Sequence, residues 1–163
     1  DWVPLPGALE AVARLNQAGW RVVIVSNQPG IGRGLLDMAV LNAIHTKMNK
    51  AMSAAGARVE AVFFCPHVPD DACTCRKPAP GLYQQVAERY GVSLKGVPAA
   101  GDSVWDAQAA YAAGCAPHLL LTGNSEMCRN GPLPPDLPPG TCVHTDLQAF
   151  ADAILNEKTC CLA

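Results

Sequence analysis

Arg21-Val-Val-Ile-Val25 is the segment that indicates the fold class of this chain. The residues after Arg21 are all β-branched and apolar, without the polar alternation of a strand that has one face in water. Such a run is typical of a strand buried on both faces, as in a parallel sheet covered by helices. The segment therefore predicts an α/β protein.

Helices and strands alternate along the chain on both sides of this segment. A helix opens at Pro6-Gly7 and ends at Gly19, and a polar, glycine-rich turn follows the strand. Further helices are expected at about 37–55, 80–90, 104–113 and 146–156, and further strands at 59–64, 97–101 and 118–121. Residues 123–140 carry five prolines and are expected to be irregular. This alternation predicts right-handed crossovers and a doubly wound parallel sheet.

The composition argues against several classes of protein. Half of the 163 residues are hydrophobic, 16% are charged, and the formal net charge is −2. Without a broad basic field, nucleic acid is not an expected partner. No apolar run approaches the ~20 residues that span a bilayer, and the first residues lack the features of a secretory signal. We therefore expect a cytoplasmic monomer without a membrane partner.

Three cysteines and a histidine follow the strand at 59–64, in the pattern C-x-H-x5-C-x-C. Thiolate and imidazole are ligands that Zn²⁺ prefers, and four of them close a tetrahedral structural site. The alternatives are a reduced cluster without a role, or disulfides. A core of this size needs no disulfides, so we expect the remaining cysteines to be reduced. The expected zinc ligands are Cys65, His67, Cys73 and Cys75.

Polar residues follow three of the expected strands. In doubly wound sheets, ligands bind beyond the carboxyl ends of the strands, so we expect these residues to converge on one pocket. They are Ser26 to Gln28, the pair Arg76-Lys77, and Asp102-Ser103 with Asp106.

Each cluster suits one part of a phosphate site. The segment 26–34 offers a hydroxyl, an amide and backbone N–H groups to an oxyanion, although an ordinary turn has the same composition. Lys77 supplies a point charge and Arg76 a planar fork, unless the two form a solvated face. Asp102 and Asp106 suit a hard cation such as Mg²⁺, unless Asp102 merely caps a helix. Together the clusters predict phosphoryl chemistry.

Three motifs resemble those of phosphatases of the haloacid dehalogenase superfamily. They are Val25-Ser-Asn-Gln-x-Gly-Ile-x-Arg-Gly34, Cys65-Pro-His…Cys-x-Cys-Arg-Lys-Pro78 and Gly101-Asp-Ser-x-x-Asp106. Within the superfamily, the chain resembles the phosphatases of heptose 1,7-bisphosphate, whose relatives include histidinol-phosphate phosphatases. The resemblance covers essentially the whole chain. It implies a Rossmann-like, doubly wound parallel sheet with a zinc-pinned loop, in a single phosphatase domain spanning residues 1–163.

The resemblance also implies a role for each site residue. Ser26 would hydrogen-bond the transferring phosphoryl group, Lys77 would neutralise its charge, and Asp102 would bind a catalytic Mg²⁺. Asp106 would orient Lys77 or a metal-bound water. The other substrate-binding residues would be Asn27, Gln28, Pro29, Arg76 and Ser103, and the zinc ligands would be Cys65, His67, Cys73 and Cys75.

One departure from the family concerns the nucleophile. The family begins with a strand ending in Asp-x-Asp, whose first Asp attacks phosphorus and whose second is the general acid and base. This chain has no such motif. In the family that strand is central, so the strands at 21–25 and 97–101 would lose the partner between them. We therefore expect the natural polypeptide to be longer at its N-terminus.

Three functions remain in view. The first is Mg²⁺-dependent removal of the 7-phosphate of heptose 1,7-bisphosphate, a sugar phosphate on the way to the lipopolysaccharide core, through an aspartyl-phosphate intermediate. A histidinol-phosphate phosphatase with the same machinery is the second. The third is a catalytically silent, zinc-bearing module that binds phosphate, and the missing Asp-x-Asp is its only support.

Several conspicuous residues are expected to be structural. His45, His118 and His144 have no partner at metal-ligand spacing and are expected to be surface or boundary side chains. Trp20 and Trp105 are expected to be packing residues. The sequence indicates no role for Cys115, Cys128, Cys142, Cys160 and Cys161.

Overall fold

Parallel strands and helices alternate in this protein, as the sequence predicts. The structure is a computed structural model that describes residues 4–27, 38–65 and 73–156. The chain forms two compact units, unit 1 at Asp1–Arg76 and unit 2 at Lys77–Ala163. Among the helices of the described residues, none combines the length and the apolar character needed to cross a membrane.

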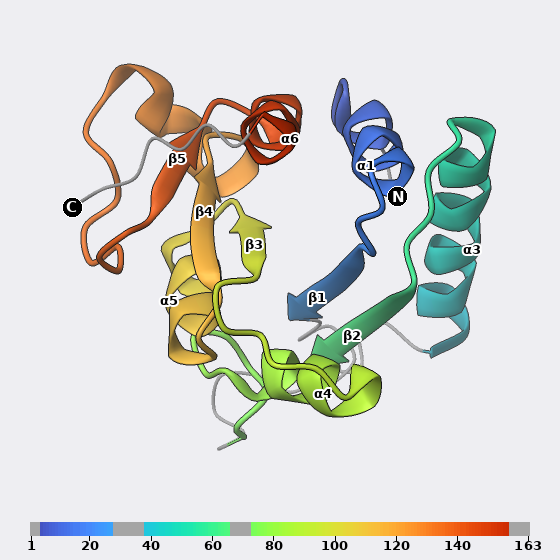
Figure 1. The fold of residues 1–163 in the computed structure, drawn as a ribbon, viewed down its shortest axis with the longest axis horizontal. Helices are drawn as coiled ribbons and strands as arrows, with labels where there is room; N and C mark the ends of the chain where they lie inside the picture. The colour runs from blue at the N-terminus through green and yellow to red at the C-terminus, as the bar shows by residue number, and fades with distance from the viewer. Residues whose placement is uncertain (1–3, 28–37, 66–72, 157–163) are drawn as a thin grey trace. The chain divides into compact units, whose positions relative to one another are not determined.

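Unit 1 is built on two parallel strands, which lie side by side in Figure 1. Their register places Val23 opposite Ala61 and Asn27 opposite Cys65. Helix α1 (Ala8–Gln17) packs against helix α3 (Met38–Ala54), and its buried apolar face includes Val12 and Leu15. The elements are α1 (Ala8–Gln17), β1 (Val23–Asn27), α3 (Met38–Ala54) and β2 (Ala61–Cys65).

Unit 2 is built on a three-stranded parallel sheet in the order β3-β4-β5. The helix α5 packs against β3 and β4, and α6 packs against β4 and β5. Leu119 of the central strand is fully buried. The elements are α4 (Gly81–Tyr90), β3 (Pro98–Gly101), α5 (Val104–Ala112), β4 (Ala116–Leu120), η1 (Gly123–Asn130), β5 (Cys142–His144) and α6 (Leu147–Leu155).

The expectation that the strands at 21–25 and 97–101 lack a partner between them stays a prediction. Among the described strands, β1 pairs with β2 and β3 pairs with β4, in two separate sheets.

The structure corrects the sequence analysis at four places. Ser26 and Asn27 are the last residues of β1 rather than the first of a turn, and the rest of that segment, 28–34, lies outside the described residues. The region expected to be irregular contains the 3-10 helix η1. The short strand β5 was not predicted. Cys142 is disulfide-bonded, so the expectation that every cysteine outside the metal cluster is reduced is wrong.

Candidate active site

A buried ion pair organises the polar side chains of unit 2. Lys77 Nζ donates a hydrogen bond to Asp106 Oδ1 at 2.6 Å, and the two side chains are only 10% and 14% exposed. A charge-assisted hydrogen bond shielded from water is stronger than one between neutral groups. The pair therefore holds the ammonium of Lys77 in place. Of the two roles expected for Asp106, the structure supports the orientation of Lys77.

The local sequence explains why Asp106 stands where it does. Ser103 is the N-cap of α5, and its Oγ accepts the N–H of Asp106 at 3.2 Å. Asp106 Oδ2 in turn accepts the N–H groups of Ser103 and Asp102, both at 3.1 Å. This capping box satisfies N–H groups that a helix start leaves without partners. A Cβ at Gly101 would overlap the Asp106 side chain, which explains the glycine.

Asp102 lies between β3 and α5 and is held by the start of η1. Its Oδ2 accepts the backbone N–H of Asn124 at 3.0 Å, and its Oδ1 accepts the side-chain amide of Asn124 at 3.4 Å. Ser125 Oγ donates to the backbone oxygen of Asp102 at 2.6 Å. Sequence reasoning missed Asn124 and Ser125, because they stand 22 and 23 residues from their partner. Their place directly after the buried strand β4 is the one signal that could have found them.

The donor chemistry at Asp102 fits Mg²⁺. The carboxylate oxygens are hard ligands, and each has more than one lone pair, so the contacts with Asn124 do not exhaust them. Mg²⁺ is usually held by one or two carboxylates, with water and phosphate oxygens completing the site. Asp102 alone at the end of a parallel strand is therefore a sufficient protein contribution from unit 2.

Unit 1 carries a cluster of three thiols. The Sγ atoms of Cys65, Cys73 and Cys75 lie within 4.8 Å of one another, with Cys75 donating to Cys65 at 2.8 Å and Cys73 at 3.7 Å from Cys65. All three are reduced thiols, so the disulfide interpretation is wrong. His67, the fourth expected ligand, lies outside the described residues. Three thiols gathered in one place suit Zn²⁺, which takes cysteine sulfur as a ligand.

Burial and hydrogen bonds act in opposite directions within this cluster. Burial tends to raise the pKa of the Cys73 thiol, but hydrogen bonds with the Arg76 backbone and with the other two thiols outweigh it and lower the pKa to about 7. Burial, followed by hydrogen bonds to Cys65 and Cys73 and by their charges, raises the pKa of Cys75 to about 12. One thiol thus ionises readily while its neighbour resists ionisation.

The structure brings part of the predicted site together. Lys77, Asp102 and Ser103 all contact Asp106 within unit 2. The half-buried Ser26 and Arg76 belong to unit 1, as does Asn27. Gln28 and Pro29 lie outside the described residues. The convergence of Ser26 with Lys77 and Asp102 stays a prediction.

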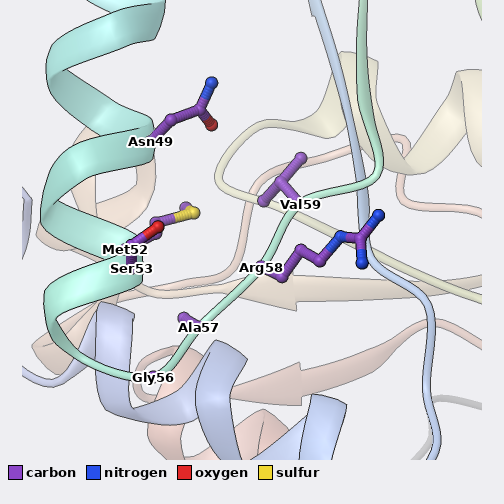
Figure 2. A pocket seen from close by; sticks show the side chains of 7 residues that line it. All are labelled: Asn49, Met52, Ser53, Gly56, Ala57, Arg58 and Val59. Carbon is purple, nitrogen blue, oxygen red and sulfur yellow. The ribbon is translucent and has the colours of Figure 1, made fainter.

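A hollow in unit 1 contains none of the predicted site residues. It has a volume of about 460 Å³ and lies between the end of α3 and the segment that leads to β2. Figure 2 shows Asn49 and Met52 of α3 directed toward that segment, while Arg58 extends away from the helix. Arg58 pairs with Glu60 at 3.5 Å. The charged side chain that lines the hollow is thus paired with a carboxylate and does not mark a phosphate site.

The structure corrects the expectation for two histidines. His118 and His144 are buried, with Nδ1 of His118 2.9 Å from Nε2 of His144 and the rings stacked at 5.1 Å. Phe150 packs edge-on against both. Burial, and then the charge of His144, lower the pKa of His118 to about 4, and burial also lowers the pKa of His144.

The expectation for two tryptophans is wrong as well, because Trp20 and Trp105 are 41% and 52% exposed.

Known proteins match this chain over nearly its whole length. It is 54% identical over 159 residues to the D-glycero-beta-D-manno-heptose-1,7-bisphosphate 7-phosphatase of Bordetella bronchiseptica. These residues cover 96% of this chain and 86% of the relative. It is 45% identical over 155 residues to the protein of the same name from Pseudomonas aeruginosa, which covers 95% of this chain and 85% of the relative.

Solved structures agree with the fold. The crystal structure of D,D-heptose 1,7-bisphosphate phosphatase from B. bronchiseptica, complexed with magnesium and phosphate, superposes with a TM-score of 0.86 at 53% identity, covering 96% of this chain and 86% of that one. The corresponding enzyme from Burkholderia thailandensis superposes with a TM-score of 0.73 at 48% identity, covering 94% of this chain and 87% of that one. Residues 1–114 match the haloacid dehalogenase-like hydrolases as a family. With sequence, fold and family match in agreement, the chain belongs to the haloacid dehalogenase-like hydrolases.

Proposed function

We propose that this protein is a Mg²⁺-dependent phosphatase that removes the 7-phosphate of D-glycero-D-manno-heptose 1,7-bisphosphate, on the way to the lipopolysaccharide core. One observation carries the proposal: Asp106 holds the Lys77 ammonium and also accepts the backbone N–H of Asp102, the residue directly after the parallel strand β3. The similarity to proteins named for this activity supports the choice of substrate.

The residues of the chain divide the work on the phosphoryl group. Lys77 neutralises its equatorial oxygens, and because Asp106 already fixes the ammonium, little reorganisation is needed during the reaction. Asp102 would hold Mg²⁺, which supplies further neutralisation of charge on the phosphoryl oxygens. Ser26 donates a hydrogen bond to the same group. The residues that would recognise the rest of the substrate are Asn27, Gln28, Pro29, Arg76 and Ser103.

Hydrolysis through an aspartyl-phosphate needs a carboxylate nucleophile. Its oxygen would attack phosphorus as the sugar oxygen leaves with a proton, and water would then cleave the acyl phosphate to release phosphate. The 163 residues contain no Asp-x-Asp motif. The expected N-terminal extension therefore remains a prediction, which the codons upstream of Asp1 test. An in-frame Asp-x-Asp supports it, and its absence favours the silent phosphate-binding module.

We also propose that the thiol cluster binds structural zinc, with His67 as the fourth ligand. The mutual approach of the three Sγ atoms supports this assignment, since a site with four protein ligands and no open position is structural. Cys75 precedes Lys77 by two residues, so a metal that fixes Cys75 also restricts the backbone that carries the ammonium. Metal analysis of the purified protein is expected to give one zinc per chain.

Turnover of two substrates tests the main proposal. Protein made from the complete gene is compared on heptose 1,7-bisphosphate and on histidinol phosphate, with Mg²⁺ and with EDTA. We expect a preference for the heptose substrate and loss of turnover in EDTA. A clear preference for the amino-alcohol phosphate would transfer the assignment to histidinol-phosphate phosphatase. A cytoplasmic location and a monomeric state also remain predictions, the latter tested by analytical ultracentrifugation.

A further inference from the structure

Three contacts from the start of η1 surround Asp102. The backbone N–H of Asn124 reaches Oδ2 at 3.0 Å and its side-chain amide lies 3.4 Å from Oδ1, while Ser125 Oγ holds the Asp102 carbonyl at 2.6 Å. Gly123 provides further, independent evidence that the start of η1 packs closely against Asp102. A Cβ at Gly123 would overlap Asp102 Oδ2, and its φ of +48° is one that side chains rarely adopt.

These contacts restrict how the carboxylate can be used. One residue donates to both oxygens, so rotation of the carboxylate about its Cβ–Cγ bond is opposed at both ends. Each oxygen of an ionised carboxylate has about two acceptor positions, and Asn124 occupies one on each. A cation therefore meets a carboxylate whose two oxygens are each already engaged by a donor, which favours approach to a single oxygen over approach to both.

We propose that Asn124 is a positioning residue that holds Asp102 for coordination through one oxygen and thereby favours Mg²⁺ over Ca²⁺. The proposal rests on the proposed function for the placement of Mg²⁺ at Asp102. Mg²⁺ demands near-octahedral geometry and takes single oxygens, whereas Ca²⁺ has longer, more flexible coordination and accepts bidentate carboxylates. Fixing the carboxylate thus helps the smaller ion more.

Asn124 offers a clean test because its side chain is exposed and its loss opens no cavity in the core. Mg²⁺ and Ca²⁺ affinities are measured by calorimetric titration, without substrate, for the protein made from the complete gene, for Asn124→Ala and for Asn130→Ala. The last variant makes the same chemical change at the other end of η1 and serves as the matched control. Thermal unfolding of each variant verifies that it is folded.

In Asn124→Ala, we expect the Mg²⁺ affinity to fall about tenfold, the usual effect of removing a partner of a metal ligand. The Ca²⁺ affinity falls less, so the preference for Mg²⁺ narrows, and Asn130→Ala leaves both affinities unchanged. An unchanged Mg²⁺ affinity, or an equal loss for both cations, overturns the proposal. Failure of the proposed function appears separately, as binding of Mg²⁺ by a protein that does not hydrolyse phosphomonoesters.

Discussion

The ion-pair cluster of unit 2 and the thiol cluster of unit 1 both bring polar side chains together, but the partners within each cluster differ. Around Lys77 and Asp106, opposite charges and backbone N–H groups satisfy one another within the chain. Around Cys65, Cys73 and Cys75, three groups of the same kind face one another. If all three ionised, their charges would repel one another.

This difference indicates which cluster depends on an added ion. Folding alone brings the ion pair together, since the Asp106 carboxylate accepts what an ammonium and two N–H groups donate. Hydrogen bonds also hold the thiols, but such bonds are weak for sulfur. We therefore expect that removal of metal leaves the ion pair intact and changes the thiol cluster.

Breaking the ion pair at Lys77 is expected to have the largest effect on turnover. Lys77→Ala removes the charge proposed to neutralise the phosphoryl group, so kcat should fall by about 10³-fold, the upper range for loss of one preorganised donor. Zinc content should stay at the level of the unaltered protein. Steady-state kinetics and metal analysis of the complete protein measure the two quantities.

Lys95→Ala is the matched control for this change. Lys95 is exposed, and its side chain lies outside the cluster, so the same loss of charge should leave kcat unchanged. Normal turnover in Lys77→Ala would mean that the ammonium does not act on phosphate at all.

Breaking the thiol cluster at Cys73 is expected to have the next largest effect. Cys73→Ser replaces a soft ligand by a hydroxyl and should lower zinc affinity by at least about 100-fold, since loss of a mere partner of a ligand already costs 10–100-fold. Chelator competition measures the affinity. Cys128→Ser, at a free thiol outside the cluster, should retain zinc. Full zinc retention in Cys73→Ser would exclude this ligand set.

The histidine pair extends the comparison to a cluster that is satisfied only while uncharged. When both rings are neutral, one ring nitrogen donates to the other across 2.9 Å; when both are protonated, two N–H groups face each other. The pKa of His118 is about 4 in the folded protein, below its ordinary value of 6.5. Between these values the unfolded chain binds more protons, so stability is greatest above pH 6.5 and is lost as pH falls.

We expect the free energy of unfolding to fall by about 2 kcal/mol between pH 7.5 and pH 5. Urea unfolding at each pH measures it. His144→Gln should flatten this dependence, because it removes one member of the pair, whereas His45→Gln leaves the pair intact and should keep the slope. Stability that does not change over this range would mean that the pair is not buried in solution.

How far the sequence predicted these clusters depended on the distance between partners along the chain. Gly101-Asp-Ser-x-x-Asp106 is a local pattern, and its spacing fits the capping box that Ser103 and Asp106 form, although the sequence analysis considered Asp102 as the cap. Apolar runs between turn residues predicted the strands from β1 to β4. The parallel pairing of these strands and the family to which the chain belongs confirm the α/β fold.

The contacts that sequence reasoning missed join residues far apart. His118 and His144 are separated by 26 residues, and Asn124 is 22 residues from Asp102. Periodicity reports which face of an element is apolar, but it does not report which strands become neighbours. The three-residue strand β5 was too short to show a period, so the partner of His118 could not be recognised.

The smallest expected effect separates two roles for Ser103, which the sequence analysis placed in substrate binding. In the structure its Oγ accepts the N–H of Asp106 and caps α5. Ser103→Ala should therefore cost about 1 kcal/mol of unfolding free energy, the usual loss for an N-cap. Because Asp106 keeps its bonds to Lys77 and to the Asp102 N–H, kcat should change little.

Ser93→Ala is the matched control for this change. Ser93 Oγ accepts the Lys95 N–H at 3.3 Å in an exposed segment, so its loss should cost less unfolding free energy. A rise in KM without a loss of stability in Ser103→Ala would show that the hydroxyl contacts substrate, and that the cap is secondary.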